Sequence, residues 1–124
     1  MVVRTGGISH VHLLVQNTDR AVAFYGDVFG MEVEFTDGDI VFMKTLGGSD
    51  SLALHLATSD EDRARIGRNG GYEHFGMYVV DRTKLDDAIA AVESAGGSLV
   101  DRGEHAPGIP YAYVRDLDGY VIEI

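Results

Sequence analysis

The chain has 124 residues, 45% of them hydrophobic and 24% charged, which is typical of one globular domain with a buried core. Its formal net charge of −10 argues against a nucleic-acid partner, because most of the surface would repel phosphates. There is no cysteine, which excludes disulfides and thiolate metal sites. With no apolar run of roughly 20 residues and no signal-peptide pattern, we expect a cytoplasmic protein that does not engage membranes.

The first half of the chain predicts one strand, one helix and three further strands. A strand is expected over 8–15, followed by a helix that is capped by Asn17, runs to about Phe29 and ends at Gly30. Three short strands follow at about 31–36, 39–46 and 51–57. The order is βαβββ, and it defines a first module of about residues 7–57.

The second half repeats this order after a polar linker over about 58–70. A strand is expected over 72–80, and Thr83 with Asp86 forms a capping box for a helix that ends at Gly96-Gly97. Strands are then expected near 98–102, 111–115 and 120–124. The second module therefore covers about residues 71–124, and residues 1–124 form a single domain.

Polar residues fall at equivalent positions of the repeat. His10 corresponds to His74 (74 − 10 = 64), and His55 corresponds to Glu123 (123 − 55 = 68). Strand alternation places each of these side chains opposite the apolar stripe of its strand. Imidazole and carboxylate groups at matched positions of two modules indicate a divalent metal site on a pseudo-two-fold axis.

Three segments resemble the vicinal oxygen chelate superfamily, which includes glyoxalase I, bleomycin- and fosfomycin-resistance proteins and extradiol dioxygenases. The matching segments are His10-x-x-Leu13-x-Val15, Ala23-Phe24-Tyr25 with Val28-Phe29-Gly30, and Asp116-x-Asp118-Gly119-x-x-x-Glu123. The resemblance covers about residues 7–124. It implies an α+β fold in which two βαβββ modules form a cupped mixed sheet around one divalent metal, with the helices on the outer face. It also implies a small-molecule substrate and a homodimer, with the modules paired within one chain or exchanged between two.

The same resemblance assigns the metal ligands. His10, His74 and Glu123 stand at family ligand positions, and His55 stands where glyoxalases and epimerases have Glu or Gln. His55 is therefore either a fourth ligand or an acid/base group beside the metal. His12 is not at a ligand position, and we expect it to line the cavity or to be hydrogen-bonded. Glu123 is the penultimate residue, and terminal residues fray unless they are paired in a sheet, so we expect either that the last strand is well paired or that the natural chain extends past Ile124.

A narrower match to the extradiol dioxygenase signature lies near the C-terminus. The chain has Gly103-Glu104-His105 and, further on, Tyr113 before the shared Asp-x-Asp-Gly ending. It departs from the signature at Ala112, where a larger apolar residue is expected, and at Leu117, where proline is expected. His105 is predicted in a loop, where it is either exposed or in contact with the substrate.

Three functions remain open, and an Fe(II) extradiol-type ring-cleaving dioxygenase is narrowly favoured among them. In it His55 is an acid/base group, while Tyr113 and His105 hydrogen-bond the substrate. The alternative is a glyoxalase-like lyase, isomerase or epimerase in which His55 coordinates Zn, Ni, Co or Mn as a Lewis acid. The third is a drug-binding or resistance protein.

Overall fold

The computed structural model describes all 124 residues and contains two four-stranded sheets and three α-helices. The first module comprises β1 (Val11–Val15), α1 (Thr18–Phe29), β2 (Met31–Asp37), β3 (Ile40–Thr45) and β4 (Leu52–Leu56). The connection contains α2 (Asp60–Arg65). The second module comprises β5 (Phe75–Gly76), the 3-10 helix η1 (Arg82–Lys84), α3 (Leu85–Ser94), β6 (Ser98–Ala106), β7 (Ile109–Arg115) and β8 (Val121–Glu123).

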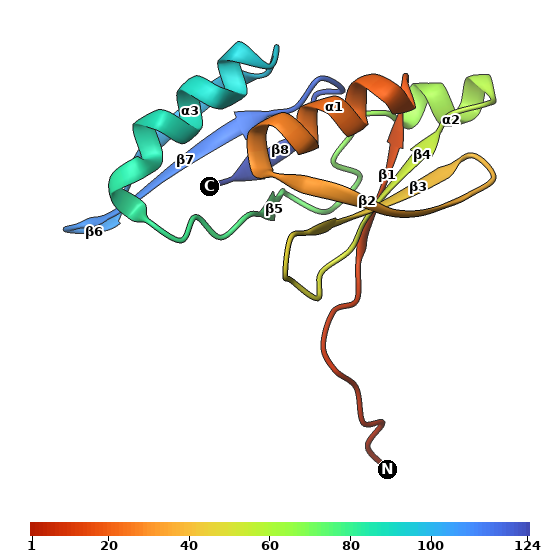
Figure 1. The fold of residues 1–124 in the computed structure, drawn as a ribbon, viewed down its shortest axis with the longest axis horizontal. Coiled ribbons are helices and arrows are strands. Elements are labelled where there is room, and N and C mark those ends of the chain that lie inside the picture. The colour runs from red at the N-terminus through yellow and green to blue at the C-terminus, as the bar shows by residue number, and fades with distance from the viewer.

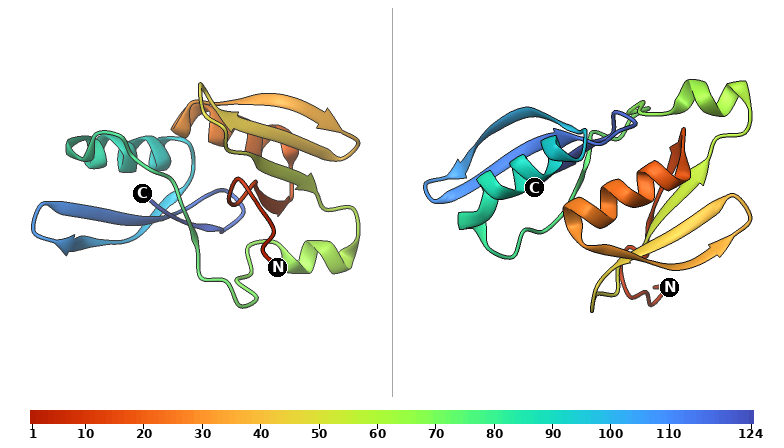
Figure 2. Two further views of the ribbon diagram at one scale, coloured as in Figure 1. Left: turned by 90° about the horizontal axis from the view of Figure 1, so that it is seen from below. Right: turned by 45° about the horizontal axis from the view of Figure 1, so that its top comes forward.

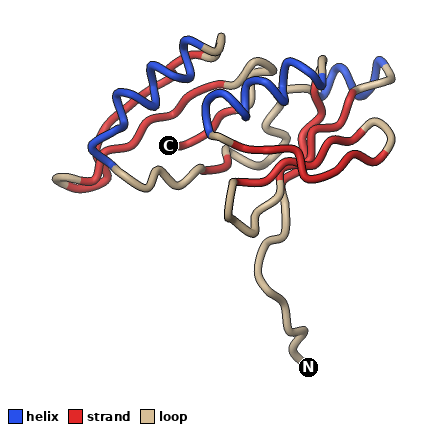
Figure 3. Tube along the Cα trace, viewed as in Figure 1, coloured by secondary structure: helices blue, strands red, loops and turns tan.

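The two sheets have the same topology. Their strand orders are β1-β4-β3-β2 and β5-β8-β7-β6. The pairs β1–β4 and β5–β8 are parallel, and all other neighbouring strands are antiparallel. Helices α1 and α3 lie along one side of the sheets (Figures 1 and 3). The expected α+β class and the repeated βαβββ order are therefore confirmed.

Helix α1 begins and ends where its sequence predicts. The Asn17 side chain accepts a hydrogen bond from the Arg20 amide, which satisfies one of the free donors of the first turn. Gly30 ends the helix in the left-handed conformation at φ 66°, which a residue without a Cβ adopts at little cost. Between these caps the helix buries Phe24 and Tyr25 in the core.

Two expectations for the second module are wrong. The strand predicted over 72–80 is reduced to β5, because its only neighbour, β8, is itself three residues long. The capping box at Thr83 and Asp86 does not form. Instead the Asp81 side chain accepts hydrogen bonds from the Thr83 amide and hydroxyl, and a 3-10 turn precedes α3.

The two modules share one hydrophobic core, to which both long helices contribute. Polar contacts reinforce this packing at the turn between β7 and β8. The Tyr25 hydroxyl donates to Asp116 Oδ2 at 2.6 Å, and the Tyr120 hydroxyl donates to the Leu14 carbonyl at 2.7 Å. The Gln16 amide donates to the Asp118 carboxylate in the same turn, at 3.0 Å. Three hydrogen bonds thus join the first module to residues 116–120.

Asp116 is the only buried charged residue of the chain, with 6% of its surface exposed. Burial raises the pKa of its carboxyl group, although hydrogen bonds from Tyr25 and from the Tyr120 and Asp118 amides oppose that shift. Burial and the neighbouring Asp116 in turn raise the pKa of Tyr25 well above its ordinary value. The carboxylate of Asp116 and the phenol of Tyr25 therefore form a buried pair in which the carboxylate is the acceptor for the phenol and the phenol is a donor to the carboxylate.

No helix is both long enough and apolar enough to cross a membrane. Residues 1–10 form no helix or strand and extend away from the body of the protein. The segment from α2 to β5 passes from the first module to the second, as both views of Figure 2 show.

We expect Tyr25→Phe to lower the free energy of unfolding by about 1–2 kcal/mol, because it leaves a buried carboxylate oxygen without its donor. Urea denaturation followed by circular dichroism measures this loss. Tyr78→Phe is the matched control, since Tyr78 is 83% exposed and makes no hydrogen bond through its side chain. Equal stability of the two variants would contradict a structural role for the Tyr25–Asp116 pair.

Candidate functional site

Three histidines gather on the first module. His10 lies immediately before β1, where its Nδ1 is 2.7 Å from the hydroxyl oxygen of the preceding Ser9. His12 follows on the same face of β1, with its ring 6.4 Å from that of His10. His55 lies on the neighbouring strand β4 and is half-buried. We call these three residues the N-terminal half-site.

A hydrogen bond joins two members of the N-terminal half-site. His12 Nε2 is 3.0 Å from His55 Nδ1, so the N–H of one ring donates a hydrogen bond to the nitrogen of the other. Partial burial, together with the nearby His55 and His10, lowers the pKa of His12 and favours its neutral form. The expectation that His12 is hydrogen-bonded is confirmed. Because His12 contacts Nδ1 of His55, the opposite nitrogen of that ring stays free for another partner.

A second cluster surrounds Glu123 on the second module. His74 Nε2 is 3.3 Å from Glu123 Oε2, and His105 Nε2 is 2.7 Å from Glu123 Oε1. His74 and Glu123 are mostly covered, with 23% and 26% of their side chains exposed, whereas His105 is 56% exposed. We call these three residues the C-terminal half-site. His105 belongs to β6, so its predicted place in a loop is wrong: the hairpin of β6 and β7 extends four residues further than its pattern indicates.

Two tyrosines of β7 support this cluster. Tyr113 packs edge-on against the His74 ring at 4.9 Å, and Tyr111 stacks on the His105 ring at 4.3 Å. Desolvation and the neighbouring Glu123 raise the pKa of Tyr113 further above neutral pH, and its protonated phenol is a hydrogen-bond donor. Tyr113 thus stands where it can donate to a group held near His74 and Glu123.

Strand β8 holds Glu123 in place although the residue is next to the C-terminus. β8 lies between β5 and β7, and the Glu123 carbonyl accepts a hydrogen bond from the Met77 amide at 2.8 Å. The final residue is paired as well, since Ile124 and Ala112 exchange backbone hydrogen bonds. The condition that the last strand be well paired is therefore met.

A single chain does not bring the predicted ligands together. His10 and His55 belong to one half-site, His74 and Glu123 belong to the other, and no group of three or more His, Cys, Asp or Glu side chains is arranged to hold a metal ion. Within the C-terminal half-site the geometry does suit a shared metal. Two ligand atoms at right angles around one metal, each about 2.1 Å from it, lie about 3 Å apart, close to the His74–Glu123 separation of 3.3 Å.

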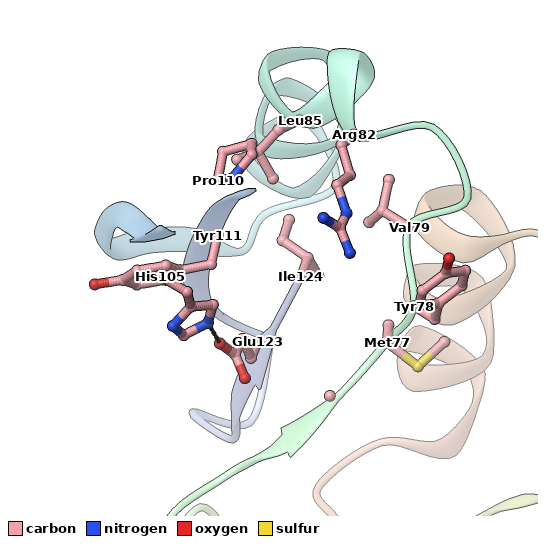
Figure 4. Close-up of a pocket in the computed structure, with 11 residues that line it drawn as sticks. Met77, Tyr78, Val79, Arg82, Leu85, His105, Pro110, Tyr111, Glu123 and Ile124 are labelled. Atoms are coloured by element: carbon pink, nitrogen blue, oxygen red, sulfur yellow. Dashed lines mark hydrogen bonds and ion pairs between the residues drawn. The ribbon is translucent and has the colours of Figure 1, made fainter. Parts of the chain in front are cut away.

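The C-terminal half-site opens into a pocket of about 370 Å³ (Figure 4). Glu123 and His105 lie at one end, and Arg82 extends toward it from the start of η1. Sequence reasoning did not identify Arg82 or Tyr111 as candidates for this region. Arg82 lies in a connection without periodicity, and the role of Tyr111 depends on the length of the β6–β7 hairpin, so no local pattern signals either of them.

Comparison with known proteins identifies relatives over nearly the whole chain. Residues 7–124 match the model of the Glyoxalase/Bleomycin resistance protein/Dioxygenase superfamily. The metallothiol transferase FosB of Shouchella clausii is 33% identical over 121 residues, which cover 95% of this chain and 78% of that protein. The lactoylglutathione lyase of Haemophilus influenzae is 32% identical over 127 residues, which cover 94% of this chain and 89% of that protein.

Solved structures share the fold. A mutant of the fosfomycin resistance protein FosX from Listeria monocytogenes, crystallised with Mn(II) and 1S,2S-dihydroxypropylphosphonic acid, aligns with a TM-score of 0.74. The alignment covers 97% of this chain and 89% of that one, at 18% sequence identity. At this identity the similarity establishes the fold alone.

Proposed function

Since the chain belongs to the Glyoxalase/Bleomycin resistance protein/Dioxygenase superfamily, we propose that it is a divalent-metal-dependent enzyme of the glyoxalase type. It acts on a small molecule that binds through two adjacent oxygens. The support comes from the relatives named as a metallothiol transferase and a lactoylglutathione lyase, and from the FosX structure solved with Mn(II). Non-redox lyase or transferase chemistry is therefore our first candidate.

One observation carries the proposal: the chain has two incomplete half-sites with complementary donors. His10 and His55 lack a carboxylate, while His74 and Glu123 lack the donors needed to fill a coordination sphere. A second copy of the chain would supply what each half-site lacks, and a two-fold dimer would form two such sites. We therefore propose a homodimer in which His10 and His55 of one chain face His74 and Glu123 of its partner.

The chain's own residues then have distinct roles. His10, His74 and Glu123 hold the metal, and His55 is either the fourth ligand or an acid/base group. A metal bound there would supply a Lewis acid for polarising substrate oxygens. Tyr113 donates a hydrogen bond to the substrate from beside His74. His105 positions Glu123 through its 2.7 Å contact and contacts the substrate from the same wall.

A second candidate is the Fe(II) extradiol-type dioxygenase. The observation that favours it is the placement of the two informative residues of that signature: Tyr113 packs on His74 and is the β7 residue paired with Glu123, and His105 contacts the Glu123 carboxylate. In this version His55 does not coordinate, and two histidines with one carboxylate leave positions open for substrate and dioxygen. Dioxygen uptake with a panel of catechols, measured on iron-loaded protein, separates it from the first candidate.

We expect Zn, Ni, Co or Mn in protein purified without chelator under anaerobic conditions, and we expect His55→Ala to lose it. Four protein ligands suit Lewis-acid chemistry, and removing one of them weakens binding. Elemental analysis of both proteins measures this. Iron retained in the variant would favour the dioxygenase, and absence of metal uptake by the wild type would contradict both candidates.

A mixture of two inactive variants tests the shared site. His10→Ala and Glu123→Gln each damage every site of their own homodimers. If the sites lie between chains, a heterodimer has one site with both changes and one intact site, so refolding an equal mixture restores about one quarter of a metal per chain. Elemental analysis after gel filtration measures the recovery. If each site is built within one chain, the mixture recovers nothing.

We expect His12→Phe to weaken metal binding about tenfold, because a hydrogen bond to the second nitrogen of a ligating imidazole orients its ring. His12→Gln retains a hydrogen-bonding group and should restore part of the affinity. Competition titration gives the affinity, and the visible spectrum of the Co(II)-loaded protein reports a change in ligand geometry. Wild-type affinity and spectrum in His12→Phe would show that His12 does not position His55.

A further inference from the structure

The pocket of the C-terminal half-site contains one positively charged side chain. Arg82 is the first residue of η1, and its guanidinium reaches into the space between Val79 and Ile124 (Figure 4). The chain as a whole has a net charge of −10. An arginine whose guanidinium is directed into a pocket is a candidate for binding an anion there, against the repulsion of the overall negative charge.

The acidic residues that neighbour Arg82 in the sequence are engaged with other partners. Asp81 accepts hydrogen bonds from the amide and hydroxyl of Thr83. Asp87 pairs with Lys84 at 3.7 Å, and Asp86 pairs with Arg102 at 2.8 Å. No carboxylate of the chain forms a salt bridge with Arg82, so its five N–H donors are free to bind a ligand.

The two ends of the pocket differ in charge, and the wall between them is mostly apolar. Between Arg82 and Glu123 the walls are mostly apolar and consist of side chains from the segment after β5, from α3, from β7 and from the C-terminus: Met77, Tyr78, Val79, Leu85, Pro110, Tyr111 and Ile124. Glu123 repels an anion at its own end, and Arg82 attracts one at the other. An elongated ligand therefore enters with its anionic end at Arg82 and its apolar body along this wall.

We propose that Arg82 binds the carboxylate of an elongated substrate whose apolar body lies against Ile124 and whose oxygen-bearing end reaches Glu123. The assignment of the far end rests on the proposed function, because Glu123 is one of the proposed metal ligands. The recognition of the carboxylate by Arg82 does not depend on a metal. Guanidinium groups pair with carboxylates through two parallel hydrogen bonds, which gives orientation as well as affinity.

The test uses chelator-treated full-length protein and two probes that differ only in charge. We expect 3-phenylpropanoate to bind about fivefold more tightly than 3-phenylpropan-1-ol, a modest preference because the guanidinium is exposed. NMR titration of the Met77 and Ile124 methyl groups gives both dissociation constants. Arg82→Gln should abolish the preference for the acid and leave the affinity for the alcohol unchanged.

Two further variants control the experiment. Lys84→Gln removes a positive charge from the same short helix without altering the pocket lining, and it should keep the preference. Arg82→Lys keeps the charge without the planar fork and should keep part of it. Equal binding of both probes by the wild type, a preference that survives in Arg82→Gln, or no response of the two methyl groups would overturn the proposal.

The two proposals fail separately in this design. The probe titration contains no metal, so its result is independent of whether His10, His74 and Glu123 form a metal site. A preserved carboxylate preference in a protein that takes up no metal would overturn the proposed function and leave the Arg82 site standing. Metal uptake without any preference for the carboxylate probe would overturn the Arg82 site and leave the proposed function standing.

Discussion

The two modules are held together by one shared hydrophobic core, and the buried hydrogen bond between Tyr25 and Asp116 reinforces that packing. A carboxylate is stable in a protein interior only when donors surround it, and Asp116 receives them from the Tyr25 hydroxyl and from two amides of its own turn. The bond thereby fixes the turn after β7 against helix α1. Strand β8 begins directly after that turn, so the shared core and the hydrogen bonds of this turn together position Glu123 relative to the first module.

This packing explains why the candidate ligands are divided. Helices α1 and α3 bury their apolar faces in one core, and strand alternation turns the polar residues of both sheets away from that core. His55 and Glu123 therefore lie on surfaces that the helices leave uncovered, yet on different modules. Within one chain these donors do not gather into a group of three or more, which is why the proposed active site and the proposed dimer are one hypothesis.

Local patterns predicted the elements that local interactions stabilise. Helix α1 was located from its caps at Asn17 and Gly30, because these residues satisfy the helix ends by themselves. Strand β5 and the placement of His105 were predicted wrongly, since a strand's length depends on the partner it pairs with. For the same reason Arg82 was missed: its connection to the pocket arises only when η1 is placed beside the end of β8.

The sequence by itself determined the repeat, the βαβββ order and the side of each strand on which the candidate ligands project, because periodicity and capping are properties of neighbouring residues. It also established the family, through motifs distributed along the chain. Only the tertiary structure decided which of these residues meet. It separated His10 and His55 from His74 and Glu123, and it brought His105 to Glu123. Those contacts depend on how the helices pack and how far the strands pair, and both are non-local interactions that no segment encodes alone.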